Sequence, residues 1–259
     1  MKRISQLKDE AIVTLHGNWG KAALASLGLI VVSIAFNMFF TLLSGTNILD
    51  YYEALFSYDF SSLKEAMGGN IYVSILQGLG GILFTTPLGI GVYNSFRVLF
   101  ESKGADNAIF NNFFKLVFNK DYLHIVLVSF CSGFLIGLMM IPAIIVLVLI
   151  GIVLESVVAT VFLVIAGIVY IVWIAIIYSQ ISFIMVNNPE LDIIDTMRRS
   201  RTLMYGNKWR YLGLGLSFLG WLILGIFTLG IGYLWLLPYI YTTESAFYCD
   251  IRDAANAAE

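Results

Sequence analysis

The chain has 259 residues, of which 59% are hydrophobic and only 12% are charged. Soluble domains carry about twice this share of charged residues, so the composition excludes a soluble protein and predicts an integral membrane protein. The 17 acidic and 15 basic residues give a net charge of −2. Because basic residues are not in excess, the composition does not indicate nucleic acid as a partner.

The apolar runs, taken in chain order, predict an all-α protein with six transmembrane helices. A bilayer core about 30 Å thick requires roughly 20 apolar residues in a helix. The first run has no small-residue cleavage site after it, so we expect it to be retained rather than removed as a signal peptide. The expected spans are residues 22–43, 73–96, 122–154, 156–186, 211–229 and 231–249.

Residues 122–186 allow two interpretations, because they contain only one formally charged residue, Glu155. Three short spans would fit this length, but they would place the positive charges of residues 198–210 outside. Two long, tilted helices are therefore favoured, with Pro142 bending the first of them.

The basic residues are distributed unevenly about the six expected spans. All but one of the 15 Lys and Arg residues fall on one side of the membrane, and the exception is Lys64. The positive-inside rule assigns the basic side to the cytoplasm, so we expect both termini to be cytoplasmic. The acidic and aromatic segment 44–72 is expected to lie on the outer interface.

Three stretches on the basic side resemble one another. Residues 7–15, 110–117 and 191–204 have the periodicity of amphipathic helices, and each leads into a span. The first and third continue into similar turns, TLHGNW from Thr14 and TLMYGNKW from Thr202. The chain is thus predicted to be one membrane domain, 1–259, with possible internal units 1–100, 101–187 and 188–259. Such similarities also arise without duplication, because membrane boundaries select Trp, Tyr and small polar residues.

Two C-terminal stretches resemble a known family. These are SRTLMYGNKW from Ser200 and SFLGWLILGIFTLGIGYLWLLPYIYTTESAFY from Ser217. They look like the C-terminal signature of the family catalogued as domain of unknown function 975. The resemblance implies a bacterial multi-span membrane protein, and it brings no catalytic residue with it.

Motifs that carry catalysis or metal binding are missing from the sequence. There is no HExxH, CxxC or GxSxG pattern, and two histidines are too few for a typical metal cluster. We therefore expect no enzymatic activity and no cofactor.

Glu244 is the main candidate for a functional residue, because it lies inside the sixth expected span. An ionised carboxylate there costs on the order of 2 to 3 kcal/mol unless it is paired or faces a wet cavity. Arg97 at the end of the second span is the expected partner, with Tyr93 and Tyr241 nearby. The group could be a ligand site or proton site, a structural ion pair, or a side chain that extends to the headgroups.

The basic segment before the fifth span is a candidate for binding anionic lipid headgroups. Each basic residue near the surface contributes about 1 kcal/mol to such binding. The alternative is that the segment only rests on the membrane and enforces the topology. The candidate lipid contacts are Arg198, Arg199, Arg201, Lys208 and Arg210.

These observations favour a non-enzymatic accessory or lipid-associated scaffold of the bacterial inner membrane. The alternative is a transporter or permease for a small or amphipathic molecule, suggested by the repeated hairpins and polar clusters. Pro87 and Pro238 could free backbone carbonyls for a ligand, although such prolines more often only kink a helix. An intramembrane enzyme ranks last, since the nucleophiles have no obvious base. The sequence identifies membrane lipids as partners but no protein partner.

Overall fold

The computed structural model describes residues 1–44, 71–105, 122–154 and 157–257. Every regular element within these ranges is a helix, which confirms the all-α prediction for the described part of the chain. The outer segment 45–70 and the amphipathic stretch 110–117 lie outside the described residues. The helices are α1 (Ile4–Leu15), α2 (Trp19–Ser44), α5 (Ile71–Gly80), α6 (Thr86–Glu101), α8 (Tyr122–Leu154), α9 (Val157–Ile177), α10 (Ile181–Asn187), α11 (Ile193–Leu203), α12 (Lys208–Leu216), α13 (Leu219–Phe227) and α14 (Tyr233–Asn256), with a π-helical turn, η1 (Gly81–Thr85), between α5 and α6.

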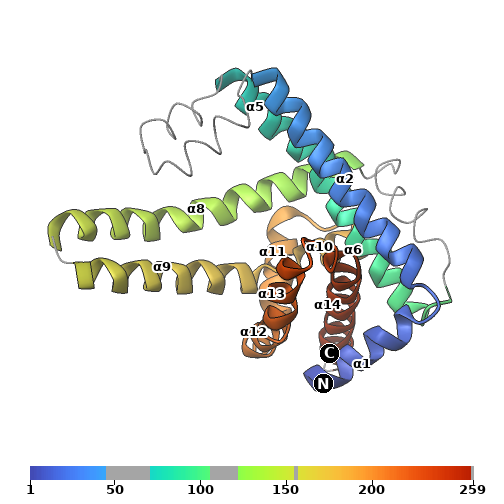
Figure 1. Cartoon of the computed structure of the whole chain (residues 1–259). Helices are drawn as coiled ribbons and strands as arrows, with labels where there is room; N and C mark the ends of the chain where they lie inside the picture. Colours follow the sequence, from blue (N-terminus) through green and yellow to red (C-terminus); the bar gives the residue numbers. More distant parts are fainter. Residues whose placement is uncertain (45–70, 106–121, 155–156, 258–259) are drawn as a thin grey trace.

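The long helices are arranged as hairpins around α14. Helix α2 runs beside α5 and α6, α8 runs beside α9, and α13 is followed by the returning α14. Figure 1 shows that the far end of the α8–α9 hairpin points away from the other helices. Helix α14 is central, since it packs against α1, α2, α6, α11 and α13.

Five stretches of the described residues are long and apolar enough to cross a membrane. This result supports the prediction of an integral membrane protein. Helix α14, which contains all but the first two residues of the sixth expected span 231–249, does not belong to this set. The five stretches are Trp19–Leu43, Ile75–Glu101, Tyr122–Pro142, Val161–Asn187 and Lys208–Phe227.

The more polar composition of α14 has a structural reason. Its second half is covered by other helices rather than by lipid, and Phe247, Tyr248 and Ile251 are fully buried in one core cluster. A helix covered by protein can carry hydroxyl and carboxyl groups that a lipid-facing helix cannot. By contrast, large apolar side chains are exposed along α2, α9 and α13.

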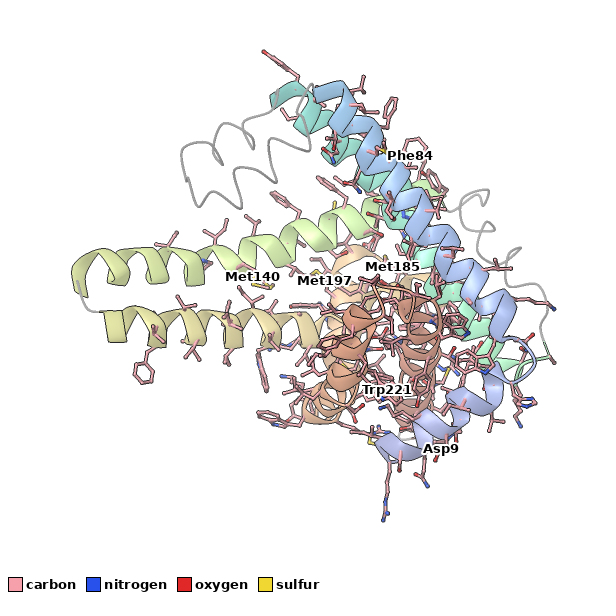
Figure 2. All side chains as sticks on the ribbon, in the orientation of Figure 1. Asp9, Phe84, Met140, Met185, Met197 and Trp221 are labelled. Carbon is pink, nitrogen blue, oxygen red and sulfur yellow. The ribbon has the colours of Figure 1, made fainter. Side chains whose placement is uncertain are left out.

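A separate apolar cluster holds the base of the α8–α9 hairpin. Met185 of α10 and Met197 of α11 are buried there together with Ile90 of α6 and Ile125 of α8. Figure 2 shows the two methionines at this meeting point. The flexible thioether side chains fill the irregular space between four helices.

Proline-induced gaps in the helices are closed by the protein. Pro87 has no N–H group, so the carbonyl of Leu83 loses its usual donor within the helix. The hydroxyl of Tyr122 donates to that carbonyl instead. Near Pro142, inside α8, the Tyr170 hydroxyl donates to the Met139 carbonyl at 2.8 Å, one residue after the Leu138 carbonyl that loses its donor to the proline. The expected ligand role of the carbonyl freed by Pro87 is therefore not supported.

The two ends of the chain lie side by side (Figure 1). The backbone N–H of Lys2 donates to both carboxylate oxygens of Asp250, at 3.2 and 3.1 Å. Arg210 of α12 forms an ion pair with the same carboxylate at 2.5 Å and also donates to the Lys2 carbonyl. These contacts tie the start of α1 and the start of α12 to the last third of α14.

Helices α1 and α11 bury side chains at matching positions. Leu7, Ala11 and Leu15 of the first correspond to Thr196, Ser200 and Met204 of the second, and all six side chains are at most 1% exposed. Both helices end in a glycine with positive φ, +81° at Gly17 and +77° at Gly206, followed by a buried asparagine. The counterpart expected in the middle unit lies outside the described residues, so threefold repetition stays a prediction.

Candidate functional site

Polar side chains meet where α6, α10 and α14 lie alongside one another. Helices α6 and α14 run in the same direction, because Tyr93 contacts Tyr241 at one level and Glu101 contacts Arg252 two turns further on. Spacings of four residues place Tyr93, Arg97 and Glu101 on one face of α6. The same spacing places Glu244, Tyr248 and Arg252 on one face of α14. The two faces meet at two successive levels. We call the level of Tyr93 and Tyr241 the upper layer, and the level of Arg97, Glu101 and Arg252 the lower layer.

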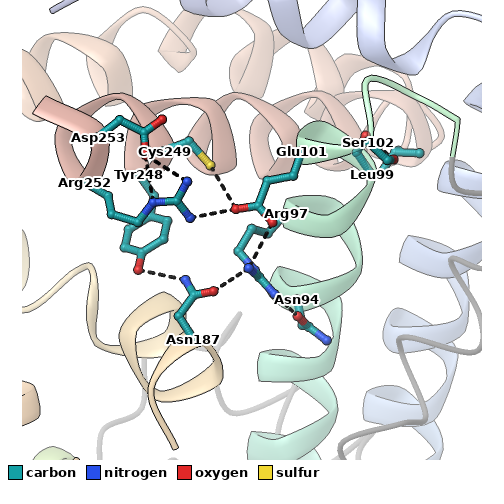
Figure 3. A network of polar contacts seen from close by, with 10 residues as sticks. All are labelled: Asn94, Arg97, Leu99, Glu101, Ser102, Asn187, Tyr248, Cys249, Arg252 and Asp253. Atoms are coloured by element: carbon teal, nitrogen blue, oxygen red, sulfur yellow. Dashed lines mark hydrogen bonds and ion pairs between the residues drawn. The ribbon is translucent and has the colours of Figure 1, made fainter. Parts of the chain in front are cut away.

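Arg97 is the centre of the lower layer, shown in Figure 3. Its guanidinium pairs with Glu101 at 3.1 Å, donates to Asn94 Oδ1 at 2.9 Å and also donates to Asn187 Oδ1. The Asn187 amide then donates to the Tyr248 hydroxyl at 2.7 Å. Arg97 thus connects three helices, and its side chain is only 13% exposed.

Glu101 extends this layer to the end of α14. Its carboxylate pairs with Arg252 at 2.6 Å, and Arg252 pairs with Asp253 at 2.9 Å. Partial burial acts to lower the pKa of Arg252, but the hydrogen bonds that it donates to the carboxylates of Glu101 and Asp253 raise this pKa above its ordinary value. The thiol of Cys249 lies 3.8 Å from Glu101.

The expected ion pair between Arg97 and Glu244 is wrong. Arg97 is engaged by Glu101 and two asparagines, whereas Glu244 accepts a hydrogen bond from the Tyr211 hydroxyl of α12 at 3.2 Å. The reason is geometric: Glu101 follows Arg97 by one turn of the same helix, and Glu244 lies one turn away from the Arg97 layer.

The predicted aromatic residues do lie together in the upper layer. The rings of Tyr93 and Tyr241 are 5.2 Å apart in an edge-to-face arrangement. Tyr93 also meets Phe183 of α10 edge to face, and Tyr241 stacks on Phe96. These contacts hold the two tyrosine rings in fixed positions beside the Glu244 level.

The structure also identifies residues that the sequence did not single out. Asn187 and Tyr248 join α10 to α14, and Glu101 joins α6 to α14. Only Glu101 had a local signal, because it follows Arg97 at the i, i+4 spacing of a helical ion pair. The others are brought to the site by packing of helices distant in sequence.

The five candidate lipid contacts are in different surroundings. Arg198, Arg199 and Arg201 are exposed on α11, and Arg198 pairs with Asp195 at 2.8 Å. Lys208 lies over the Trp173 ring, 4.6 Å from its centroid. Arg210 is 17% exposed and paired with Asp250, so its charge is already neutralised. The structure therefore removes Arg210 from the expected lipid contacts and leaves α11 as the basic surface.

The polar network of α6, α10 and α14 holds these three helices together. Its four charged residues, Arg97, Glu101, Arg252 and Asp253, pair with one another. In the part of the chain that the structure describes, no group of three or more His, Cys, Asp or Glu side chains is placed to hold a metal ion. The network can therefore fix the relative positions of three helices with hydrogen bonds strengthened by charge.

The comparisons with known proteins concern almost the whole chain. No curated protein and no solved structure matches it. One family model, described as a protein of unknown function (DUF975), matches residues 1–255. The resemblance inferred from the two C-terminal stretches is thereby confirmed, and the chain belongs to the DUF975 family.

Proposed function

We propose that the chain crosses the membrane six times and that both termini are cytoplasmic. Five stretches can span by length and composition, and the turn after α13 returns the chain through α14. The contacts between Lys2 and Asp250 support a placement of both ends on one side, which is consistent with an even number of crossings. The excess of Lys and Arg at that side supports a cytoplasmic assignment.

Cysteine accessibility tests this topology. Tyr205 lies in the turn before α12 and is 83% exposed, and Leu229 lies in the turn before α14 and is 93% exposed. With Cys131 and Cys249 replaced by Ala, we expect an impermeant maleimide to label Leu229→Cys in intact cells. Tyr205→Cys should be labelled only after permeabilisation. Labelling of both variants from the same side would contradict the proposal.

For the biochemical role, we propose a non-enzymatic, lipid-associated scaffold of the bacterial inner membrane. One observation carries this proposal: Arg97, Glu101, Arg252 and Asp253 pair with one another between the helices, whereas Arg198, Arg199 and Arg201 are exposed on α11, where, among the described residues, only Arg198 is paired, with Asp195 of the same helix. An outward basic helix at the interface attracts anionic headgroups at about 1 kcal/mol per residue.

Native mass spectrometry in polymer nanodiscs tests the scaffold proposal. The wild-type protein should retain anionic lipids, and the triple variant Arg198→Gln, Arg199→Gln and Arg201→Gln should retain fewer at equal abundance. Glu190→Gln, a change of charge just before α11, serves as the control and should leave retention unchanged. Unaltered lipid retention in the triple variant would contradict the role assigned to α11.

A transporter or permease is the second candidate, because one buried polar chain lies between the helices. Glu244 accepts from Tyr211, Ser179 lies beside Tyr211, and the Gln180 amide donates to the Ser179 hydroxyl at 2.8 Å. The side-chain amide oxygen of Gln180, Oε1, is buried without a partner among the described residues. A bound small molecule that is lost in Glu244→Gln and kept in Arg97→Gln would favour this candidate over the scaffold.

A further inference from the structure

A groove of about 320 Å³ lies along the outer face of the α13–α14 hairpin. Three tryptophans from three helices line it, Trp19 at the start of α2, Trp221 on α13 and Trp235 on α14. Leu236 and Tyr239 complete the end nearer α1. The lining is almost entirely apolar, and two of the tryptophans, Trp221 and Trp235, are more than half exposed. Figure 2 labels Trp221 beside α13 and α14.

The opposite end of the groove is closed by a tight turn. A Cβ atom at Gly225 would lie 2.7 Å from the Tyr233 ring, and one at Gly232 would lie 2.8 Å from the Thr228 hydroxyl. That hydroxyl accepts from the Gly232 N–H, and the Tyr233 hydroxyl donates to the Leu222 carbonyl at 2.9 Å. The two glycines therefore hold α13 against α14, and the groove is a fixed feature of the hairpin rather than a gap between mobile helices.

The ammonium of Lys8 lies near the Tyr239 end of the groove. It is 4.1 Å from the centroid of Phe218 and 5.9 Å from that of Tyr239, and it donates to the Ser217 carbonyl at 3.1 Å. Tyr239 lines the groove and is in edge-to-face contact with Phe218, so this pair of rings connects the groove to Lys8.

Lys8 has no carboxylate partner among the described side chains. None of their ion pairs includes it, and burial lowers its pKa. Asp9, the next residue, lines a different cavity together with Glu10 and Arg252, and its charge also acts on Tyr239. A partly desolvated ammonium with aromatic faces and one carbonyl around it is stabilised by a negatively charged ligand.

We propose that this groove binds the acyl chain of an acidic phospholipid, with the headgroup phosphate against Lys8. The three tryptophans supply the amphipathic rings that favour the membrane interface. A helix from a second copy is a poorer occupant, because helix contacts in membranes use small residues rather than exposed tryptophans. The inference deepens the lipid-associated role proposed above and rests on it, but it assigns a different site from the α11 surface.

Quenching of tryptophan fluorescence by brominated acyl chains tests the proposal directly. The full-length protein is placed in phosphatidylcholine nanodiscs containing a minor fraction of brominated phosphatidylglycerol or of brominated phosphatidylcholine. Replacing Trp173 and Trp209 by Phe leaves only the three groove tryptophans as emitters. We expect an apparent preference for the acidic lipid of about fivefold, the factor that corresponds to about 1 kcal/mol for one basic residue.

Variants at Lys8 distinguish headgroup binding from loss of fold. Lys8→Gln should bring quenching by the acidic lipid down to that by phosphatidylcholine, and Lys8→Arg should restore the preference. Equal quenching by both lipids in the wild type, or no quenching by either, would overturn the proposal. If the triple arginine variant of α11 loses the preference while Lys8→Gln keeps it, the lipid-associated role stands and this inference falls.

Discussion

Helices α1 and α11 have the same buried pattern but opposite surroundings. Both are followed by a glycine with positive φ, by a buried asparagine and by a further helix, α2 after α1 and α12 after α11. Helix α1 packs along α14 and α12, and its cation Lys8 faces the protein. Helix α11 exposes three arginines. The comparison teaches that the buried positions determine the helix and its following turn, whereas the outward residues can differ and determine what the helix contacts.

The largest expected effect comes from truncating the equivalent core residues Leu15 and Met204, both 0% exposed. Leu15→Ala and Met204→Ala should each lower the free energy of unfolding by about 2 to 5 kcal/mol, because each leaves a cavity. Titration with SDS in mixed micelles measures this quantity. Val13→Ala and Ile194→Ala, on the exposed faces of the same two helices, are the matched controls. A small loss at one position and a large loss at the other would break the equivalence.

The next effect concerns the two turns. Gly17→Ala and Gly206→Ala should each cost about 1 to 2 kcal/mol, because the left-handed conformation is unfavourable for a residue with a Cβ atom. Gly20→Ala and Gly215→Ala are matched controls inside the following helices, where an added Cβ meets no atom within 4 Å. They should stabilise the protein by about 0.5 to 1 kcal/mol. Equal changes in the free energy of unfolding at the turn glycines and the helix glycines would contradict the argument that positive φ makes alanine unfavourable in the turns.

A smaller effect should separate the two units. The Asn18 amide donates to the Gly104 carbonyl beyond α6 at 2.8 Å, whereas the Asn207 amide donates to the carbonyl of Leu203, the last residue of the preceding α11, at 3.0 Å. Each substitution should cost about 1 kcal/mol, the usual net contribution of one hydrogen bond. Hydrogen exchange tests the difference, because only Asn18→Ala should accelerate exchange at the amides of Gly104 and Ala105. Acceleration in both variants would show that Asn18 has no bridging role.

Most of the helical framework could be predicted from composition and periodicity. The expected third span, residues 122–154, coincides with α8, and the apolar run of residues 156–186 contains α9 and α10. The sixth expected span, residues 231–249, largely overlaps α14, which is not apolar enough to be counted as a span. Its neighbours cover it, and a sequence shows hydropathy but not which helices provide that cover.

The site was less predictable than the framework, for a related reason. Tyr93 and Tyr241 were expected to lie together, because the aromatic and polar residues near the cytoplasmic end of each span place both at the same depth. Their rings are indeed in contact. The partner of Arg97 was assigned wrongly, since depth alone does not reveal which face of each helix meets which neighbour. Asn187 carried no signal, because its importance comes from packing between α10, α6 and α14.

The smallest effect on stability should come from giving α11 the outward charges of α1. Arg198→Asp and Arg199→Glu introduce the residues found at the matching positions 9 and 10, and both arginines are exposed. We expect the free energy of unfolding to change by no more than about 0.5 kcal/mol, since exposed positions contribute little. Retention of acidic lipid should nevertheless fall, and the difference from wild type should shrink at high ionic strength because salt screens exposed charges. A large loss of stability with unchanged lipid retention would mean that α11 uses its arginines for folding, and the division between buried and outward positions would fail.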